Sequence, residues 1–291
     1  MYKRILIKKR KRHGGLHASC VFQWKGMIIA VKNFSTRHET AHRRILMVVS
    51  IFLGLLAWHF VSHMPGIGLV IVGPAEVFRL LYTDVFQDGR LPTDLRYSLT
   101  RIFSGFALAF VVSIPVAFLM GWYKTVRALI EPWIQFLRTI PPIALIPLVI
   151  VLMGIGESAR ISVIFFCSFL VMVITIFQGV TNVDLVMIKA ARTFGARDID
   201  IFFTVIIPAS FPFILVAMRL GISTALTSLI ASEMTGSRWG LGTMIQEAGL
   251  FFNMTRVMMG IMVIGIIGFT LDKVMLFLEK KLTYWQETKK N

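Results

Sequence analysis

Two runs of this chain are free of charged residues over the full length of a membrane-spanning helix. They cover residues 102–123 and residues 161–183. A helix needs about 20 largely apolar residues to cross a bilayer. Four further apolar runs cover residues 45–63, 139–156, 202–231 and 257–278. We therefore expect an all-α membrane protein with about six transmembrane helices.

The third run, residues 139–156, is short and begins with three prolines. They are Pro141, Pro142 and Pro147. Proline is tolerated in the first turn of a helix, and deeper in the helix it produces a kink. We expect this run to be a single short span.

The composition supports lipid rather than water as the main solvent. Hydrophobic residues make up 56% of the chain and charged residues only 16%, against about 25% charged residues in soluble domains. The net charge of +16 would also suit a nucleic-acid-binding protein. The basic residues, however, stand at the ends of the apolar runs, which is the distribution that orients membrane proteins.

The basic residues also predict the topology. Residues 1–44 hold twelve of the 31 lysines and arginines, and no cleavable signal peptide is evident. With the N-terminus inside, 23 of the 31 fall on the cytoplasmic side and 7 on the outer side. We expect an inner-membrane protein with a basic cytoplasmic tail (1–44), a transmembrane domain (45–286) and a cytoplasmic C-terminal end (287–291).

No catalytic pattern is present in the sequence. It contains no Walker A, HExxH or GxSxG motif. His59 and His63 share a helix face, and their spacing suits a metal ion, but no third ligand lies near them in the sequence. We interpret them as interfacial histidines, and we expect neither a metal site nor an enzymatic activity on this chain.

The fifth run combines small hydroxylated residues with two charges, Arg219 and Glu233. A charge within a span is costly, so it often lines a polar route or a protein interface, although an arginine can also snorkel to the membrane surface. The two charges stand about 21 Å apart along one helix and cannot pair. The candidate translocation pathway consists of Arg219, Ser223, Thr224, Ser228, Ser232 and Glu233. Ordinary helix packing by small residues is the alternative.

The loop before this run reads KAARTFGARDIDIFFTVIIP, residues 189–208. Ala190 and Ala191 are good helix formers with little bulk. Gly195 can adopt a positive φ and turn the chain. A second amphipathic stretch, residues 199–207, leads to Pro208 at the entry of the fifth run. A helix, a glycine turn and a second helix would form a protrusion that a partner protein can approach closely.

This loop resembles the conserved loop in permease subunits of ATP-binding-cassette importers. That motif has Glu-Ala-Ala, three residues, Gly, nine residues, and then Ile-x-Leu-Pro. Lys189 replaces the glutamate, and the register is kept by Ala190, Ala191, Gly195, Val205, Ile207 and Pro208. Residues 95–109, 131–156, 240–254 and 268–285 also resemble the nitrate, sulfonate and taurine branch of that family.

The resemblance implies a type I importer permease fold with a cytoplasmic coupling helix between spans 4 and 5. A second permease subunit, as a homodimer or a heterodimer, would complete the pathway for a small oxyanion such as a sulfonate, taurine or nitrate. Two ATPase subunits would bind ATP and Mg, and an extracytoplasmic binding protein would deliver the solute. The residues expected to contact the ATPase are Lys189, Ala190, Ala191, Arg192, Gly195, Ala196 and Pro208.

Two other functions remain as alternatives. A secondary transporter driven by an ion gradient would need buried carboxylates or broken half-helices in mid-membrane. The uncharged second, third and fourth runs argue against it. A membrane-embedded enzyme would need clustered His, Asp or Glu at one membrane face, and the sequence shows no such cluster.

Overall fold

The computed structural model describes residues 42, 45–66, 68, 70–87 and 89–283. Apart from His42, the expected basic tail lies outside the described residues, as does the C-terminal end 287–291. The chain divides into two units, residues 1–68 and residues 69–291. In the first unit, the described part is mainly one apolar helix, Ile45–Ser62.

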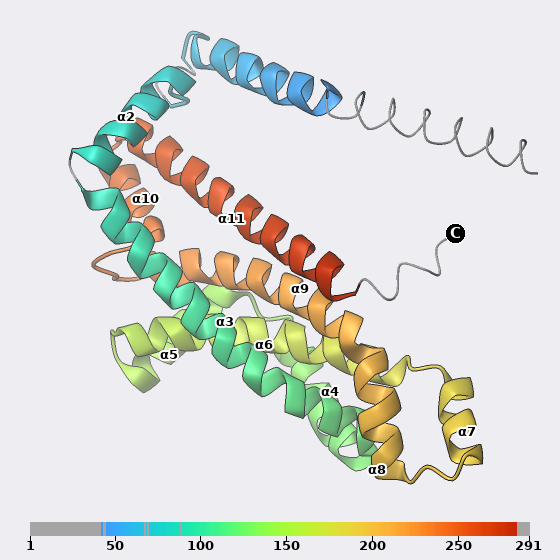
Figure 1. The fold of residues 1–291 in the computed structure, drawn as a ribbon. Helices are drawn as coiled ribbons and strands as arrows, with labels where there is room; N and C mark the ends of the chain where they lie inside the picture. The colour runs from blue at the N-terminus through green and yellow to red at the C-terminus, as the bar shows by residue number, and fades with distance from the viewer. Residues whose placement is uncertain (1–41, 43–44, 67, 69, 88, 284–291) are drawn as a thin grey trace, which may run out of the picture. The chain divides into compact units, whose positions relative to one another are not determined.

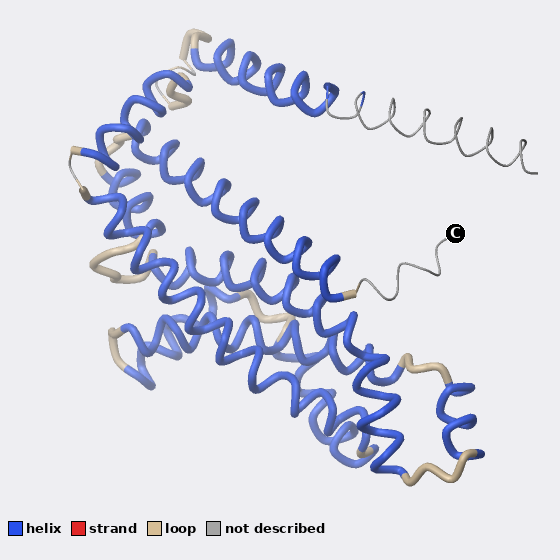
Figure 2. Tube along the Cα trace, viewed as in Figure 1, coloured by secondary structure: helices blue, strands red, loops and turns tan. Residues whose placement is uncertain are grey.

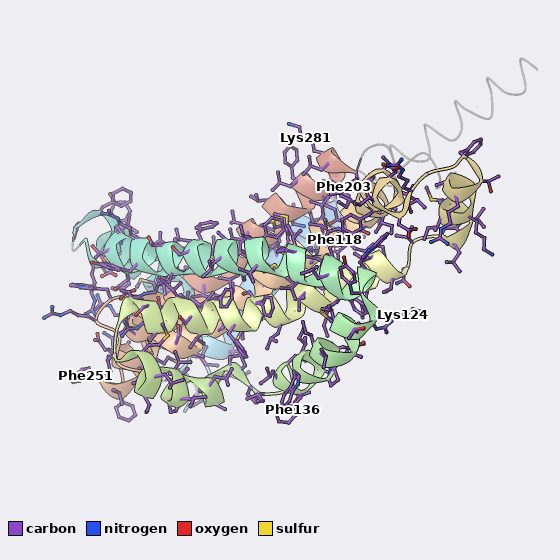
Figure 3. All side chains as sticks on the ribbon, turned by 90° about the horizontal axis from the view of Figure 1, so that it is seen from below. Phe118, Lys124, Phe136, Phe203, Phe251 and Lys281 are labelled. Atoms are coloured by element: carbon purple, nitrogen blue, oxygen red, sulfur yellow. The ribbon has the colours of Figure 1, made fainter. Side chains whose placement is uncertain are left out.

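The described part of the second unit contains helices and no strands (Figure 2). Its elements, labelled where there is room in Figure 1, are α2 (Pro74–Phe86), α3 (Arg90–Trp122), α4 (Lys124–Leu137), α5 (Pro142–Met153), α6 (Glu157–Thr181), α7 (Leu185–Thr193), α8 (Asp198–Ile201), the π-helical turn η1 (Phe202–Ile206), α9 (Ile207–Glu233), α10 (Leu241–Leu250) and α11 (Met254–Leu282).

Five helices in the described residues are long and apolar enough to cross a membrane. They are Ile45–Ser62, α3, α6, the continuous helix Asp198–Glu233, and α11. The helices α4 and α5 pass the same test only as a pair, bent by 106°. The expectation of about six spans is thus confirmed: the structure provides five, or six when the bent pair α4–α5 is counted as one broken span.

The third span is not the single helix over residues 139–156 that the sequence predicts. Its helical part α5 has only 12 residues, and α4 precedes it at a sharp angle. Pro141 and Pro142 explain the break, because proline has no N–H to donate and disfavours a helical conformation in the residue before it. Pro147 lies within α5 without ending it.

The second span also begins earlier than expected. The helix α3 starts at Arg90, twelve residues before the first residue of its uncharged run, and α2 lies between the first and second runs. In the polar first third of α3, Arg90, Asp94 and Arg101 find partners on other elements, as described below.

The core of the second unit lies where α6 packs between α3 and α9. The helix α6 is the most buried of the candidate spans. Glycines allow the close approach: a Cβ at Gly105 would meet Ile164, one at Gly121 would meet Val180, one at Gly179 would meet Phe213, and one at Gly221 would meet Met172. Small residues at crossing points are the usual means of packing helices within a membrane.

This packing predicts a stability loss for Gly179→Ala. The added Cβ would lie 2.6 Å from Cγ of Phe213, so the α6–α9 contact must open. Overpacking of this kind costs about 1–3 kcal/mol. The melting temperature of the detergent-solubilised protein measures the effect. Gly265→Ala is the matched control, because a Cβ at that helical position on α11 meets nothing within 4 Å. Equal melting temperatures for both variants would contradict this account of the contact.

Candidate functional site

The helix α7 protrudes from one end of the helices of the second unit (Figure 1). Asp184 caps its first turn, since Oδ1 accepts a hydrogen bond from the Val186 amide at 2.8 Å. None of its residues is buried, and Leu185, Val186 and Met187 are largely exposed. An amphipathic helix whose apolar side chains are left uncovered is typical of a surface that another protein completes.

The turn after α7 has the conformation that the sequence predicts. Gly195 has φ 83°, in the left-handed region, and open space surrounds the position of its missing Cβ. Arg192 Nη2 lies 3.1 Å from Asp198 Oδ1, so an exposed ion pair joins the two sides of the turn. Phe194, next to the turn, is 91% exposed. The expected helix, glycine turn and second helix are confirmed.

The two alanines of the motif differ in their surroundings. Ala190 is exposed, together with Lys189. Ala191 and Ala196 are half-buried and pack against the hydrophobic core of their own subunit. The expectation that a partner covers both Ala190 and Ala191 therefore fits Ala190 better, because Ala191 faces inward.

Pro208 lies away from the protrusion. It is the second residue of α9, within the continuous helix Asp198–Glu233, and not at the start of a separate span. The π-helical turn η1 precedes it and keeps the helix unbroken. Phe202 in this turn makes edge-to-face contacts with Phe118 and Trp122 of α3, at centroid distances of 5.7 and 5.0 Å. The base of the protrusion is thereby fixed to the bundle.

The candidate pathway residues on α9 do not share one environment. Ser223 is exposed, and Thr224 and Arg219 are half-buried. Ser228 and Ser232 are buried, and their hydroxyls donate to carbonyls of their own helix at 2.9 and 2.8 Å. Small residues of the same run, such as Gly221, pack against α6. Part of the small-residue stripe therefore serves helix packing within the subunit.

Arg219 has a partner on α11 that the sequence analysis missed. Its Nε lies 2.7 Å from Oδ1 of Asp272. The available signal was Asp272 itself, a carboxylate within the last apolar run. Contacts between helices so distant in sequence cannot be read from one run alone.

Glu233 lies in a buried polar cluster at the other end of α9, and it is 0% exposed. Oε1 accepts from Ser98 and from Arg101 Nη1, each at 2.7 Å, and Oε2 accepts from the Gly242 amide at 2.8 Å. Glu233 is enclosed within the subunit by these contacts, unlike the exposed Ser223.

Arg101 is the centre of this cluster. Its side chain is 2% exposed, and it binds Glu157 through two nitrogens at 2.6 and 2.7 Å. It also donates to the Trp239 carbonyl at 2.7 Å. Arg160 contributes a contact to Glu157 at 3.2 Å and one to the Gly236 carbonyl at 2.8 Å. The cluster joins α3, α6, α9 and the loop between α9 and α10.

Further ion pairs tie the same end of the bundle together. Arg256 of α11 lies 2.7 Å from Asp84 of α2. Arg90 of α3 contacts Glu247 of α10. Asp94 accepts a hydrogen bond from the Gly240 amide at 2.8 Å. Nothing comparable holds α7 at the opposite end, where the one ion pair described on α7 is exposed.

His59 and His63 of the first unit lie close together. The rings of His59 and His63 are 4.4 Å apart, and His63 Nδ1 lies 2.8 Å from the His59 carbonyl oxygen. Within the described ranges, no group of three or more potential metal ligands occurs.

Comparison with known proteins identifies the class. The family of binding-protein-dependent transport system inner membrane components matches residues 109–284. The chain belongs to this family, so it is a permease subunit of an ATP-binding-cassette importer. The family expected from residues 189–208 and their flanks is thereby confirmed, and an ion-gradient-driven transporter is not favoured.

Curated relatives cover most of the chain. A probable ABC transporter permease of Brucella abortus is 43% identical over 83% of this chain and 96% of its own length. The taurine transport system permease of Escherichia coli is 35% identical over 81% of this chain and 90% of its own length. The nitrate import permease of Synechocystis sp. is 29% identical over 79% and 86%, respectively.

Solved structures confirm the fold. The methionine ABC transporter MetNI in an inward-facing conformation superposes with a TM-score of 0.56 at 20% identity, over 65% of this chain and 94% of that chain. An amino acid ABC transporter reaches a TM-score of 0.57 at 18% identity, over 70% and 97%. The type I importer permease fold is thus established.

Proposed function

We propose that this permease carries a small oxyanion, such as a sulfonate, taurine or nitrate, across the inner membrane. The proposal on substrate rests on relatives named for taurine, aliphatic sulfonates and nitrate. A separate ATPase bound to α7 drives transport, and ATP and Mg bind to that partner rather than to this chain. A second permease subunit, most simply an identical copy, completes the pathway, and an extracytoplasmic binding protein delivers the solute.

The observation that carries the role of α7 is its uncovered surface at the position of the family loop. Exposed Lys189, Ala190 and Arg192 precede a glycine turn with open space around it. A rigid protrusion of this kind transmits movement of a partner to the helices on which it stands, as rigid-body rocking requires. Ala191 and Ala196 support the protrusion from the subunit side, and Pro208 lies farther along, in the first turn of α9.

Reconstitution tests the function. The chain is co-purified with a candidate ATPase, placed in liposomes, and supplied with a loaded binding protein on the outer side. We expect uptake of taurine, an alkanesulfonate or nitrate only when ATP is present on the side of the membrane that α7 faces. Uptake that follows an ion gradient without ATP would contradict the proposal.

The charge distribution predicts which side that is. Lys189, Arg192 and Arg197 of the α7 loop belong to the same side as Lys280 and Lys281 in the last turn of α11. We therefore expect α7 and the C-terminus to be cytoplasmic. A reporter that is active only in the cytoplasm should be active when fused after Asn291. Activity of a periplasm-specific reporter at the same junction would overturn this topology.

Among the candidate pathway residues of α9, we propose that those on the exposed side of the helix line the translocation route. Ser223→Cys and Thr227→Cys should react with small aqueous thiol reagents, because both positions are exposed. Ser228→Cys and Ser232→Cys are the matched controls and should stay inert, because both positions are buried. Labelling is read by mass shift in membranes. If none of the four cysteines reacts, the exposed face of α9 contacts lipid or a dry interface, and the proposed pathway role is contradicted.

A further inference from the structure

We propose that Arg219 binds the anionic group of the transported solute and that Asp272 positions it. This inference rests on the proposed function and adds a specific binding group to it. It starts from the ion pair between α9 and α11, in which Arg219 Nε lies 2.7 Å from Asp272 Oδ1.

The pair lies within two candidate membrane spans, toward the ends nearer α7. Arg219 is fourteen residues, or about 21 Å, from Glu233 at the end of α9, and Asp272 is eighteen residues, or about 27 Å, from Met254 at the start of α11. The hydrocarbon core is about 30 Å thick. The pair therefore belongs to the half of the membrane nearer α7.

The pair is partly open to its surroundings. The side chains of Arg219 and Asp272 are 40% and 33% exposed in the subunit. Charged groups within a membrane span usually face protein or a water-filled route and not lipid. Around α9, Arg219 lies about 40° from Ser223 and about 80° from Thr227. It therefore flanks the exposed hydroxylated face described above.

The guanidinium of Arg219 keeps donors to spare. Its bond to Asp272 uses Nε, and in the described part of the chain its two terminal nitrogens donate to no side chain or carbonyl. Four of the five N–H groups of an arginine belong to those nitrogens. Their planar fork matches two oxygens of a carboxylate, sulfonate or nitrate group.

Asp272 makes this arrangement suitable for transport and not only for binding. It holds the Nε side of the guanidinium and leaves the terminal nitrogens directed elsewhere. The carboxylate of Asp272 also partly balances the positive charge of Arg219. An anion therefore meets directed N–H donors but not the full attraction of an unpaired cation. Conduction requires binding that is weak enough for the ligand to leave.

An exchange of the two charges separates anion binding from a structural ion pair. The variant Arg219→Asp/Asp272→Arg restores the pair but moves the guanidinium to α11. The same exchange in the exposed pair of α4, Arg127→Glu/Glu131→Arg, is the matched control, because that pair has similar exposure and a distance of 2.8 Å. Abundance, melting temperature, ATPase stimulation by loaded binding protein, and uptake are measured for each.

We expect the α9–α11 exchange to keep abundance and ATPase stimulation while uptake falls at least about ten-fold, the loss expected when charge-assisted hydrogen bonds to the anion disappear. The α4 exchange should transport normally. Wild-type uptake by the α9–α11 exchange would show that the pair is structural only, and it would leave the importer proposal intact. Failure of ATP-dependent uptake by the unmodified chain would instead refute the importer proposal.

A second variant keeps the inference testable if the exchange does not accumulate. Arg219→Gln/Asp272→Asn is neutral and close in shape. We expect it to raise the KM for the oxyanion at least about ten-fold, with a smaller change in the maximal rate, since it removes only the charge-assisted bonds. An unchanged KM in this variant would overturn the assignment of Arg219.

Discussion

Arg101→Met is expected to lose most of its folded protein. The substitution leaves Glu233 at 0% exposure with only Ser98 and the Gly242 amide as donors. Removing one partner of a buried ion pair costs about 3–5 kcal/mol, which is a large share of the roughly 5–15 kcal/mol that stabilises a typical protein. Membrane abundance and the melting temperature in detergent measure the loss.

Two further variants isolate the cause. Arg96→Met, five residues earlier on α3, removes an exposed arginine that makes no described ion pair, and it should leave the melting temperature nearly unchanged. Arg101→Met/Glu233→Met should recover part of the loss, because no unpaired charge remains buried. A single variant as stable as the wild type would show that the cluster does not hold α3, α6 and α9 together.

Gly195→Val is expected to abolish uptake while the protein remains abundant in the membrane. A β-branched residue at φ 83° costs about 1–2 kcal/mol locally, so the turn must change its conformation. The protrusion then presents α7 at a different angle to its ATPase. Uptake and the stimulation of ATP hydrolysis by loaded binding protein should both be lost, while insertion of the spans is unaffected.

Gly154→Val is the matched control for this experiment. Gly154 has φ 79° and open space around its missing Cβ, but it precedes α6, whereas α7 follows the other end of that helix. With φ 79° and ψ 177°, Gly154 lies in a region of backbone conformation that is essentially restricted to glycine, so valine there imposes at least as much backbone strain as valine at Gly195, in a turn remote from α7. Gly154→Val should transport normally. If both variants lose uptake equally, the effect of Gly195→Val reflects general strain and not coupling.

Ala190→Trp tests the same surface without backbone strain. Ala190 is exposed on α7, so a large side chain there should block docking and leave the subunit folded. Ala191→Trp should instead lower stability, because Ala191 packs against the core of its own subunit. Co-purification of the ATPase distinguishes the two outcomes. Normal transport by Ala190→Trp would remove α7 from the coupling interface.

Local properties of the sequence determined the class of fold, the number of spans and the turn at Gly195. An uncharged run of the length of residues 161–183 has few alternatives to a membrane helix, since both hydrophobicity and backbone hydrogen bonding act within the run. The register of Ala190, Ala191 and Gly195 carried the family resemblance, because this motif also lies within one short segment of the sequence. Pro141 and Pro142 indicate a break before α5, but the sequence does not predict the angle between α4 and α5.

Only the tertiary structure decided which polar residues meet. Arg101 and Glu233 are 132 residues apart, and Arg219 and Asp272 are 53 apart, so no periodicity within one helix connects them. The structure also divided the small residues of α9 between packing, as at Gly221, and an exposed face, as at Ser223. A helical pattern specifies which residues share a face, but the neighbour that covers the face is set by how the helices pack.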